Sequence, residues 1–233
     1  MWQKKGCWIL LGIHLLILCI ALISSGGIRG LKRDWSQAFL EMGERLGEEK
    51  PKVALTFDDG PHPVYTEEIL DGLRKKGVKA TFFVIGKSVE EQKEIIERMG
   101  EEGHLIGNHT YDHVNLGQLG KKEVCVQIDK TNKAVSDITG QEMVYMRPPF
   151  GEWNKNNDCL VDMIPVLWTV DTKDWLYQSP SYSMKQVREH VKDGSIILMH
   201  DYYKTSVEAA MEIVDYLLEE GYEFVTVDEI VLD

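Results

Sequence analysis

Residues 52–61 read KVALTFDDGP. A β-rich run ends at two adjacent aspartates, Asp58 and Asp59, and the pair Gly60 and Pro61 then breaks the strand. Two neighbouring carboxylates repel each other, so we expect either a bound cation or a division of roles between them. Taken alone, an Asp-Asp-Gly turn at the surface is an equally good interpretation.

From Lys50 onward, short β-rich runs alternate with amphipathic helical stretches, which is typical of repeated βα units and a parallel sheet or barrel. The expected strands are residues 52–57, 80–85, 105–108, 143–147, 166–170, 195–199 and 223–227. The expected helices are residues 66–76, 89–102, 122–139, 184–192 and 206–220. Most of these helical patterns end at a glycine, which suits a left-handed stop. We therefore predict an α/β fold, an incomplete or distorted (β/α) barrel of seven or eight strands.

An apolar segment precedes this domain of residues 50–233. Residues 6–28 carry no charged side chain and are long enough, at about 1.5 Å per residue, to cross a membrane core of about 30 Å. Lys4 and Lys5 before the segment place the N-terminus in the cytoplasm by the positive-inside rule. We expect residues 1–28 to be a single transmembrane anchor that holds an extracellular domain at the cell membrane, with residues 29–49 as a polar stalk.

The small residues at 24–27 allow a second interpretation, in which a signal peptidase removes the apolar segment and the domain is secreted. Both interpretations export the domain. Cys125 and Cys159 are its only cysteines, so a disulfide is permitted there but is not implied. Neither cysteine lies in a CxxC spacing, which leaves zinc binding by thiolates without support.

Polar side chains lie at the carboxyl ends of the expected strands. The residues that end these strands or directly follow them are Asp58, Asp59, His109, Arg147, Asp171 and His200. In parallel α/β folds, functional residues gather at this edge of the sheet. The sequence therefore predicts a catalytic site there.

Residues 109–113 read HTYDH and supply the candidate metal ligands. Two histidines four positions apart lie on one face of a helical turn, so His109 and His113 can reach the same ion. One carboxylate completes a set of three ligands that leaves positions open for water and substrate. The histidine spacing alone is a weak signal, but beside the strand end at Asp58 and Asp59 it becomes a strong one.

Three further segments are less informative when each is taken alone. Residues 147–151, RPPFG, form a rigid loop behind an arginine, which could be an ordinary turn with a solvated side chain. In residues 171–175, DTKDW, the tryptophan could belong to the core and the first aspartate could cap a loop. Residues 198–200, LMH, end an apolar strand in a histidine that is as readily structural as catalytic.

Together the segments TFDDGP, HTYDH, RPPFG, DTKDW and LMH, in this order, resemble the NodB-homology polysaccharide deacetylases, carbohydrate esterase family 4. The resemblance spans residues 50–233, and no catalytic position of the family motifs is missing. It implies that Asp59, His109 and His113 bind a divalent metal, usually zinc in the family, for which Co²⁺ can substitute. Phe150 stands where many members have tyrosine. Because the family uses the backbone N–H of that residue, the change should affect packing more than chemistry.

The resemblance also implies roles for the remaining site residues. Asp58 is the general base and Arg147 orients it, whereas His200 is the general acid that protonates the leaving amine. Asp174 holds His200 and favours its charged form, because an acid beside an imidazole raises the imidazole pKa. The oxyanion and substrate pocket consists of the backbone N–H of Phe150 and the side chains of Trp175 and Leu198.

These roles imply hydrolysis of an acetamide to acetate and a free amine on a sugar. An anchored domain favours the cell wall, so we expect the substrate to be N-acetylglucosamine in peptidoglycan and the protein to be monomeric. N-acetylmuramic acid, chitooligosaccharides and O-acetyl xylan stay open as alternatives, because the motifs do not separate them. The net charge of −12 argues against nucleic acid as a partner, since a phosphate backbone requires clustered Lys and Arg.

Two hypotheses from other classes fit the sequence less well. A non-catalytic sugar-binding module needs neither the base Asp58 nor the acid His200. A structural zinc site normally has four protein ligands, whereas the sequence offers three.

Overall fold

The computed structural model describes residues 49–152 and 163–232. The expected anchor at residues 1–28, the stalk up to residue 48 and Cys159 lie outside these ranges, so the anchor and the stalk stay predictions. Within the two described ranges, no helix combines the length and the apolar character that crossing a membrane requires. Cys125 is disulfide-bonded.

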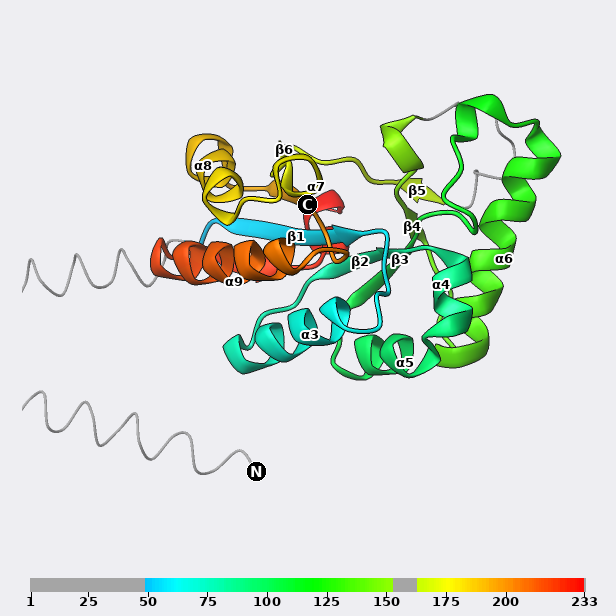
Figure 1. The fold of residues 1–233 in the computed structure, drawn as a ribbon, viewed down its shortest axis with the longest axis horizontal. Helices are drawn as coiled ribbons and strands as arrows, with labels where there is room; N and C mark the ends of the chain where they lie inside the picture. Colours follow the sequence, from blue (N-terminus) through cyan, green and yellow to red (C-terminus); the bar gives the residue numbers. More distant parts are fainter. Residues whose placement is uncertain (1–48, 153–162, 233) are drawn as a thin grey trace, which may run out of the picture. The chain divides into compact units, whose positions relative to one another are not determined.

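In the described residues, the fold is built on an eight-stranded sheet in which every strand pair is parallel. The strands are β1 (Lys52–Asp58), β2 (Thr81–Val84), β3 (Leu105–Asn108), β4 (Tyr145–Met146), β5 (Ile164–Pro165), β6 (Val170–Asp171), β7 (Ser195–His200) and β8 (Glu223–Val225). Their spatial order is β5-β4-β3-β2-β1-β7-β6, with β8 also paired to β1. Because the end strands β5 and β6 do not pair with each other, the barrel stays open (Figure 1), which confirms the predicted incomplete (β/α) barrel.

Strand β1 lies inside the sheet and determines where the site forms. One edge pairs with β7 so that Asp58 lies opposite His200, and the other edge is shared by β8 and β2. Successive side chains of a strand point to opposite faces. Residues 53, 55 and 57 therefore join the larger hydrophobic cluster under the helices, and Ala54 joins a smaller cluster on the other face. By the same alternation, Thr56 and Asp58 lie on the same face as Ala54.

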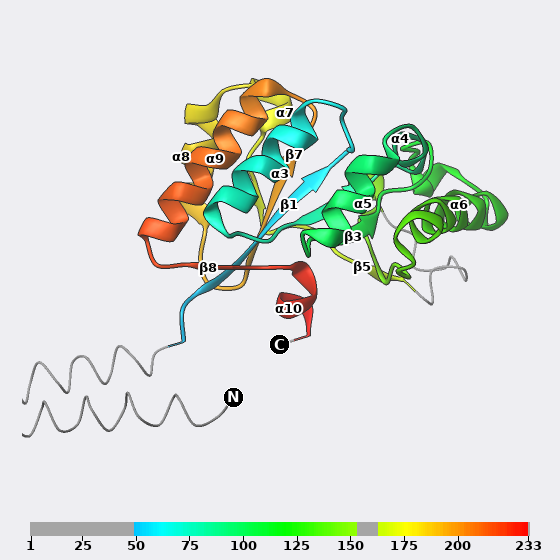
Figure 2. The same cartoon turned by 90° about the horizontal axis from the view of Figure 1, so that it is seen from below.

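The longer helices all cover one face of the sheet, whereas the short helix at Val227–Val231 packs against the smaller cluster on the other face. The longer ones are α3 (Tyr65–Lys76), α5 (Lys93–Glu101), α6 (Lys121–Thr139), α8 (Pro180–His190) and α9 (Lys204–Glu219). The shorter ones are α4 (Gly86–Glu91), α7 (Asp174–Tyr177), α10 (Val227–Val231) and the 3-10 turns η1 (Leu116–Gln118) and η2 (Pro149–Gly151). Neighbouring helices touch in the order α8, α9, α3, α5, α6, as Figure 2 shows. Each fully buried aliphatic side chain beneath them, such as Leu70 or Ile213, stabilises the fold by about 1.5–3 kcal/mol.

The structure corrects two of the expected elements. The helix expected at residues 89–102 is divided at Gln92, whose φ of −128° and ψ of 51° end α4 and begin α5. Of the strand expected at residues 166–170, only Val170 lies in a strand, as the first residue of β6. The N–H of Val166 donates to Met146 of β4, whereas that of Thr169 donates to Ile196 of β7. Between these two residues the chain crosses from one end of the sheet to the other, so it cannot pair as one strand.

Candidate active site

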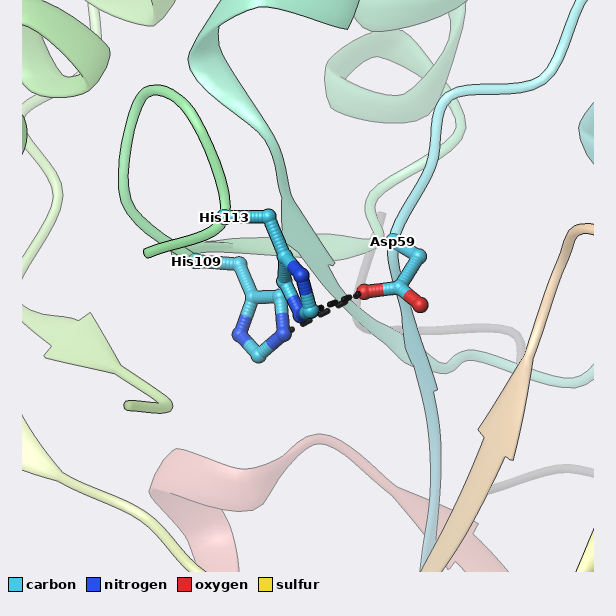
Figure 3. A group of neighbouring side chains, drawn as sticks. All are labelled: Asp59, His109 and His113. Carbon is cyan, nitrogen blue, oxygen red and sulfur yellow. Dashed lines mark ion pairs between the residues drawn. The ribbon is translucent and has the colours of Figure 1, made fainter. Parts of the chain in front are cut away.

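Asp59, His109 and His113 form a cluster where β1 and β3 end, and Figure 3 shows the two imidazoles facing the carboxylate. Asp59 Oδ1 lies 3.4 Å from Nε2 of His109 and 3.2 Å from Nε2 of His113. This oxygen is buried and accepts no hydrogen bond from any described residue. A buried carboxylate oxygen without a partner costs free energy. Because two imidazoles and one carboxylate are ligands that divalent metals such as zinc prefer, the three residues fit the expected cation.

A backbone carbonyl group directly after β4 orients His109. Its Nδ1 lies 2.7 Å from the carbonyl oxygen of Arg147, and because a carbonyl can only accept, Nδ1 carries the proton and donates it. Nε2 therefore presents its lone pair toward Asp59, which is the arrangement of a metal-binding histidine. Burial raises the pKa of Asp59, but the neighbouring histidines outweigh it and lower the pKa to about 2. The carboxylate is therefore charged at neutral pH.

The HTYDH segment is not the helical turn that we expected. Thr110 and His113 have left-handed φ angles of 65° and 53°, and the segment is an irregular loop after β3. Gln127 of α6 fixes the loop, because its Oε1 accepts the N–H groups of Tyr111 and Asp112 at 3.0 and 2.8 Å. The two histidines converge because the loop folds back. The predicted ligands therefore lie together, but their predicted local structure was wrong.

Arg147 is wholly buried and holds the carboxylate of Asp58. Its Nη1 donates to Oδ1 of Asp58 and to Oγ1 of Thr56, both at 2.7 Å. Its Nε and Nη2 donate to the carbonyl oxygens of Val166 and Leu167 at 3.0 and 3.3 Å. A buried ion pair is tolerated only when its remaining hydrogen-bonding groups are satisfied in this way. The side chain of Asp58 is therefore fixed through one oxygen.

His200, the last residue of β7, is held by Asp174. Its Nδ1 lies 2.9 Å from Oδ1 of Asp174, whose Oδ2 accepts the backbone N–H of His200 at 2.9 Å and the hydroxyl of Ser206 at 2.6 Å. Burial lowers the pKa of His200, but the hydrogen bond and the charge of Asp174 outweigh it and raise the pKa to about 9. The imidazole is therefore protonated at neutral pH, with Nε2 left to donate.

A cleft of about 650 Å³ brings these groups together. Eight predicted site residues line it: Asp58, Asp59, His109, His113, Phe150, Trp175, Leu198 and His200. Phe150 has a left-handed φ of 63°, is 64% exposed, and has its ring 4.9 Å from the ring of His113. The other two predicted residues, Arg147 and Asp174, support the cleft by bonding to Asp58 and His200. The structure therefore brings every predicted site residue to one place.

Two residues that the sequence reasoning missed follow the LMH segment directly. Asp201 is fully buried, and burial raises its pKa to about 7 against the hydrogen bond that it accepts from Thr66. Tyr202 lines the cleft and is 54% exposed. An acid directly after an apolar strand, followed by an aromatic residue where loops are usually polar, was the signal that could have identified both.

Comparison with known proteins identifies the family. The polysaccharide deacetylase family model matches residues 46–161. The peptidoglycan-N-acetylglucosamine deacetylase PgdA of Listeria monocytogenes is 44% identical over 179 residues, which cover 77% of this chain and 38% of PgdA. The solved structure of the peptidoglycan deacetylase PdaC from Bacillus subtilis matches with a TM-score of 0.76 and 40% identity, over 78% of this chain and 90% of that chain. The chain belongs to the polysaccharide deacetylase family.

Membership confirms the resemblance found in the five sequence segments. Full-length PdaC, named as a peptidoglycan-N-acetylmuramic acid deacetylase, is 40% identical over 178 residues, which cover 76% of this chain and 38% of PdaC. This chain therefore spans only 38% of the length of each of these two relatives. A CE4 family pseudoenzyme from Bacillus anthracis also matches, with a TM-score of 0.73 and 31% identity over 78% of this chain and 66% of that chain. The fold alone therefore does not decide whether a member is active.

Proposed function

We propose that this family member is a metal-dependent hydrolase that removes N-acetyl groups from N-acetylglucosamine in peptidoglycan. One observation carries the proposal. A buried carboxylate, Asp58, and a protonated imidazole, His200, end the neighbouring strands β1 and β7 and line one cleft with a donor set for a divalent cation. Hydrolysis of an acetamide needs a base for the water and an acid for the leaving amine, and a mere binding site needs neither.

Asp59, His109 and His113 are the residues that would hold the cation, with zinc or cobalt as the proposed metal. When bound, the cation would polarise the acetyl carbonyl and lower the pKa of a water molecule. Arg147 holds Oδ1 of Asp58, so Oδ2, which lies 3.9 Å from Nε2 of His109, is the oxygen that takes the proton from the attacking water.

His200 completes the reaction on the other side of the amide. Its Nδ1 is bound to Asp174, so Nε2 gives its proton to the amine as the carbon–nitrogen bond breaks. The products are acetate and a free amine on the sugar. We assign the backbone N–H of Phe150 to the developing oxyanion, where a fixed donor acts most strongly in the transition state. Leu198, which is 4% exposed, and Trp175 would contact the acetyl methyl group.

The names of two relatives support peptidoglycan as the polymer, because PgdA and PdaC are both named for it. The apolar run at residues 6–28 supports a location at the outer side of the cell membrane, close to that polymer. We therefore place the domain outside the cell, held by residues 1–28 or secreted after their removal, and acting as a monomer.

Acetate release tests the proposed function directly. The full chain, loaded with zinc or cobalt, is incubated with peptidoglycan, chitooligosaccharides and acetylated xylan side by side. Release is expected to be fastest from peptidoglycan and slower from chitooligosaccharides, which carry the same acetylated sugar. Release only from chitooligosaccharides or xylan would move the function to those polymers, and release from none of the three would refute the deacetylase.

N-acetylmuramic acid is the second candidate sugar, because PdaC is named for it and its identity to this chain is close to that of PgdA. Mass spectrometry of digested, treated peptidoglycan separates the two, since each disaccharide fragment shows which sugar has lost its acetyl group. We expect the loss on N-acetylglucosamine.

A non-catalytic sugar-binding protein is the alternative from another class, and the pseudoenzyme of the same fold makes it a real one. The intact pairs of Arg147 with Asp58 and of Asp174 with His200 argue against it, because binding a neutral sugar does not require either pair. Protein that binds zinc and acetylated sugars but releases no acetate from any of them would favour this alternative.

A further inference from the structure

Tyr202 presents an aromatic ring at the rim of the cleft that the proposed chemistry does not use. The residue is 54% exposed, yet it lines the same cleft as His200. Single exposed apolar side chains are common and need no explanation. A function for this ring therefore requires that it be held in place and that a ligand site lie beside it.

Two aromatic neighbours contact the Tyr202 ring in edge-to-face geometry. Its centroid lies 5.3 Å from that of His62 at an interplanar angle of 80°, and 5.6 Å from that of Tyr203 at 77°. His62 is itself fixed, because its ring stacks on Tyr65 at 4.5 Å and its Nδ1 accepts the N–H groups of Val64 and Tyr65 at 3.1 and 3.2 Å. The ring of Tyr202 is therefore braced, although it packs into no core cluster of the described residues.

The backbone on both sides of Tyr202 is also anchored. Asp201 is fully buried, its side chain bonds to Thr66, and its N–H donates to the carbonyl oxygen of Asp58 at 3.4 Å. The carbonyl oxygen of Tyr203 accepts the N–H of Ser206 at 3.0 Å in the first turn of α9. A ring that is already ordered loses little conformational entropy when a ligand contacts it, which favours binding.

The position of the ring points to a sugar. Tyr202 is two residues after His200, so their Cα atoms are at most about 7 Å apart. The amine that His200 protonates remains on the sugar, and the sugar must therefore lie on this side of the cleft. The face of a pyranose carries C–H bonds with partial positive charge, which suit the negative face of an aromatic ring.

Charge does not select the ligand here. The chain carries a net charge of −12, and Lys173 of the cleft is paired with Asp171 at 2.7 Å. Stacking on a neutral ring is the interaction that this rim offers.

We propose that Tyr202, positioned by His62 and Tyr203, forms a binding subsite for a second pyranose ring of the polymer, next to the ring whose acetamide is hydrolysed. This rests on the proposed function, because the neighbouring ring is defined by the one that reacts. The subsite makes an oligosaccharide a better substrate than a single acetylated ring.

Steady-state kinetics of the full, zinc-loaded chain test the subsite with Tyr202→Ala and the matched control Tyr202→Phe. The probes are chitotetraose and 4-nitrophenyl acetate, which has an acetyl group but no sugar. We expect Tyr202→Ala to raise KM for chitotetraose about threefold to tenfold with kcat unchanged, and Tyr202→Phe to stay close to the wild type. Hydrolysis of 4-nitrophenyl acetate should be the same in all three chains.

An unchanged KM for chitotetraose in Tyr202→Ala would overturn the subsite, and so would an equal loss on 4-nitrophenyl acetate, since that would indicate a disturbed His200. If the wild type releases acetate from neither probe, the proposed function fails, and the subsite is then tested by binding alone. Calorimetric titration with chitotetraose measures that binding. Weaker binding by Tyr202→Ala but not by Tyr202→Phe supports the subsite, and equal binding by the three chains, or none by the wild type, overturns it.

Discussion

Replacing Asp174 with asparagine tests the acid of the proposed reaction. Asp174 raises the pKa of His200 to about 9, against the effect of burial. Asparagine lacks the charge, so burial should bring the pKa to about 6.5 or lower. At pH 8 the protonated fraction of His200 then falls about 30-fold, and at pH 6 it changes little. We therefore expect kcat of Asp174→Asn to fall about 30-fold at pH 8 and to recover as the pH is lowered.

The same variant has a predicted effect on stability. A histidine whose pKa is raised in the folded state stabilises that state fully below its unfolded pKa of about 6.5, and this contribution is lost as the pH rises to 9. The loss amounts to about 3 kcal/mol in the wild type and should be absent in Asp174→Asn. Urea denaturation at pH 6 and pH 10 measures the difference between the two chains. Asp171→Asn is the control, because this carboxylate ends β6 three residues before Asp174 and bonds to Lys173 instead. A basic limb of kcat that does not move in Asp174→Asn would refute His200 as the acid.

Three further substitutions test the rest of the site. Asp58→Asn should abolish acetate release while zinc stays bound, and His113→Ala should lose both, as metal analysis beside the acetate assay would show. Gly60→Ala should lower the free energy of unfolding by about 1–3 kcal/mol in urea denaturation, because the added Cβ would lie 2.1 Å from Oδ2 of the buried Asp201. Arg147→Met should cost about 3–5 kcal/mol in the same assay, because it leaves the buried carboxylate of Asp58 unpaired, and adding Asp58→Asn should recover part of that loss.

Each of these predictions has an outcome that contradicts it. Acetate release by Asp58→Asn would remove this residue as the base. Gly100→Ala is the control for the glycine change, because its nearest atom is 3.7 Å from the added Cβ and its stability should not fall. A double variant no more stable than Arg147→Met would mean that Arg147 acts through its bonds to Val166 and Leu167, and not through the ion pair.

The sequence was sufficient to predict the open barrel and that the ten candidate site residues lie together, because both follow from residues close together in the chain. Strand ends at Asp58, His109 and His200 are visible as apolar runs that stop at a polar residue. Parallel pairing then places those ends at one edge of the sheet, without any knowledge of strand order.

The predictions of local structure were wrong where contacts between residues far apart in the chain decide the conformation. The segment at residues 166–170 has the composition of a strand, but it bridges β4 and β7, and two of its carbonyl groups accept from Arg147. The HTYDH loop is fixed by Gln127 of α6 and by left-handed residues that do not suit a helix. The brace of Tyr202 likewise requires the loops after β1 and β7 to meet, and the sequence pattern does not show which strands are neighbours.

The register of β1 against β7 connects the fold to the chemistry. Because Asp58 lies opposite His200, the base and the acid end adjacent strands at the same level, on the face away from the longer helices. A slip of one residue in either strand would turn its site residue toward the helices and bring Phe57 or Met199 out of the hydrophobic cluster. The burial that stabilises this register therefore also holds the base beside the acid, and mutations deep in β1 should affect turnover even where they touch no site residue.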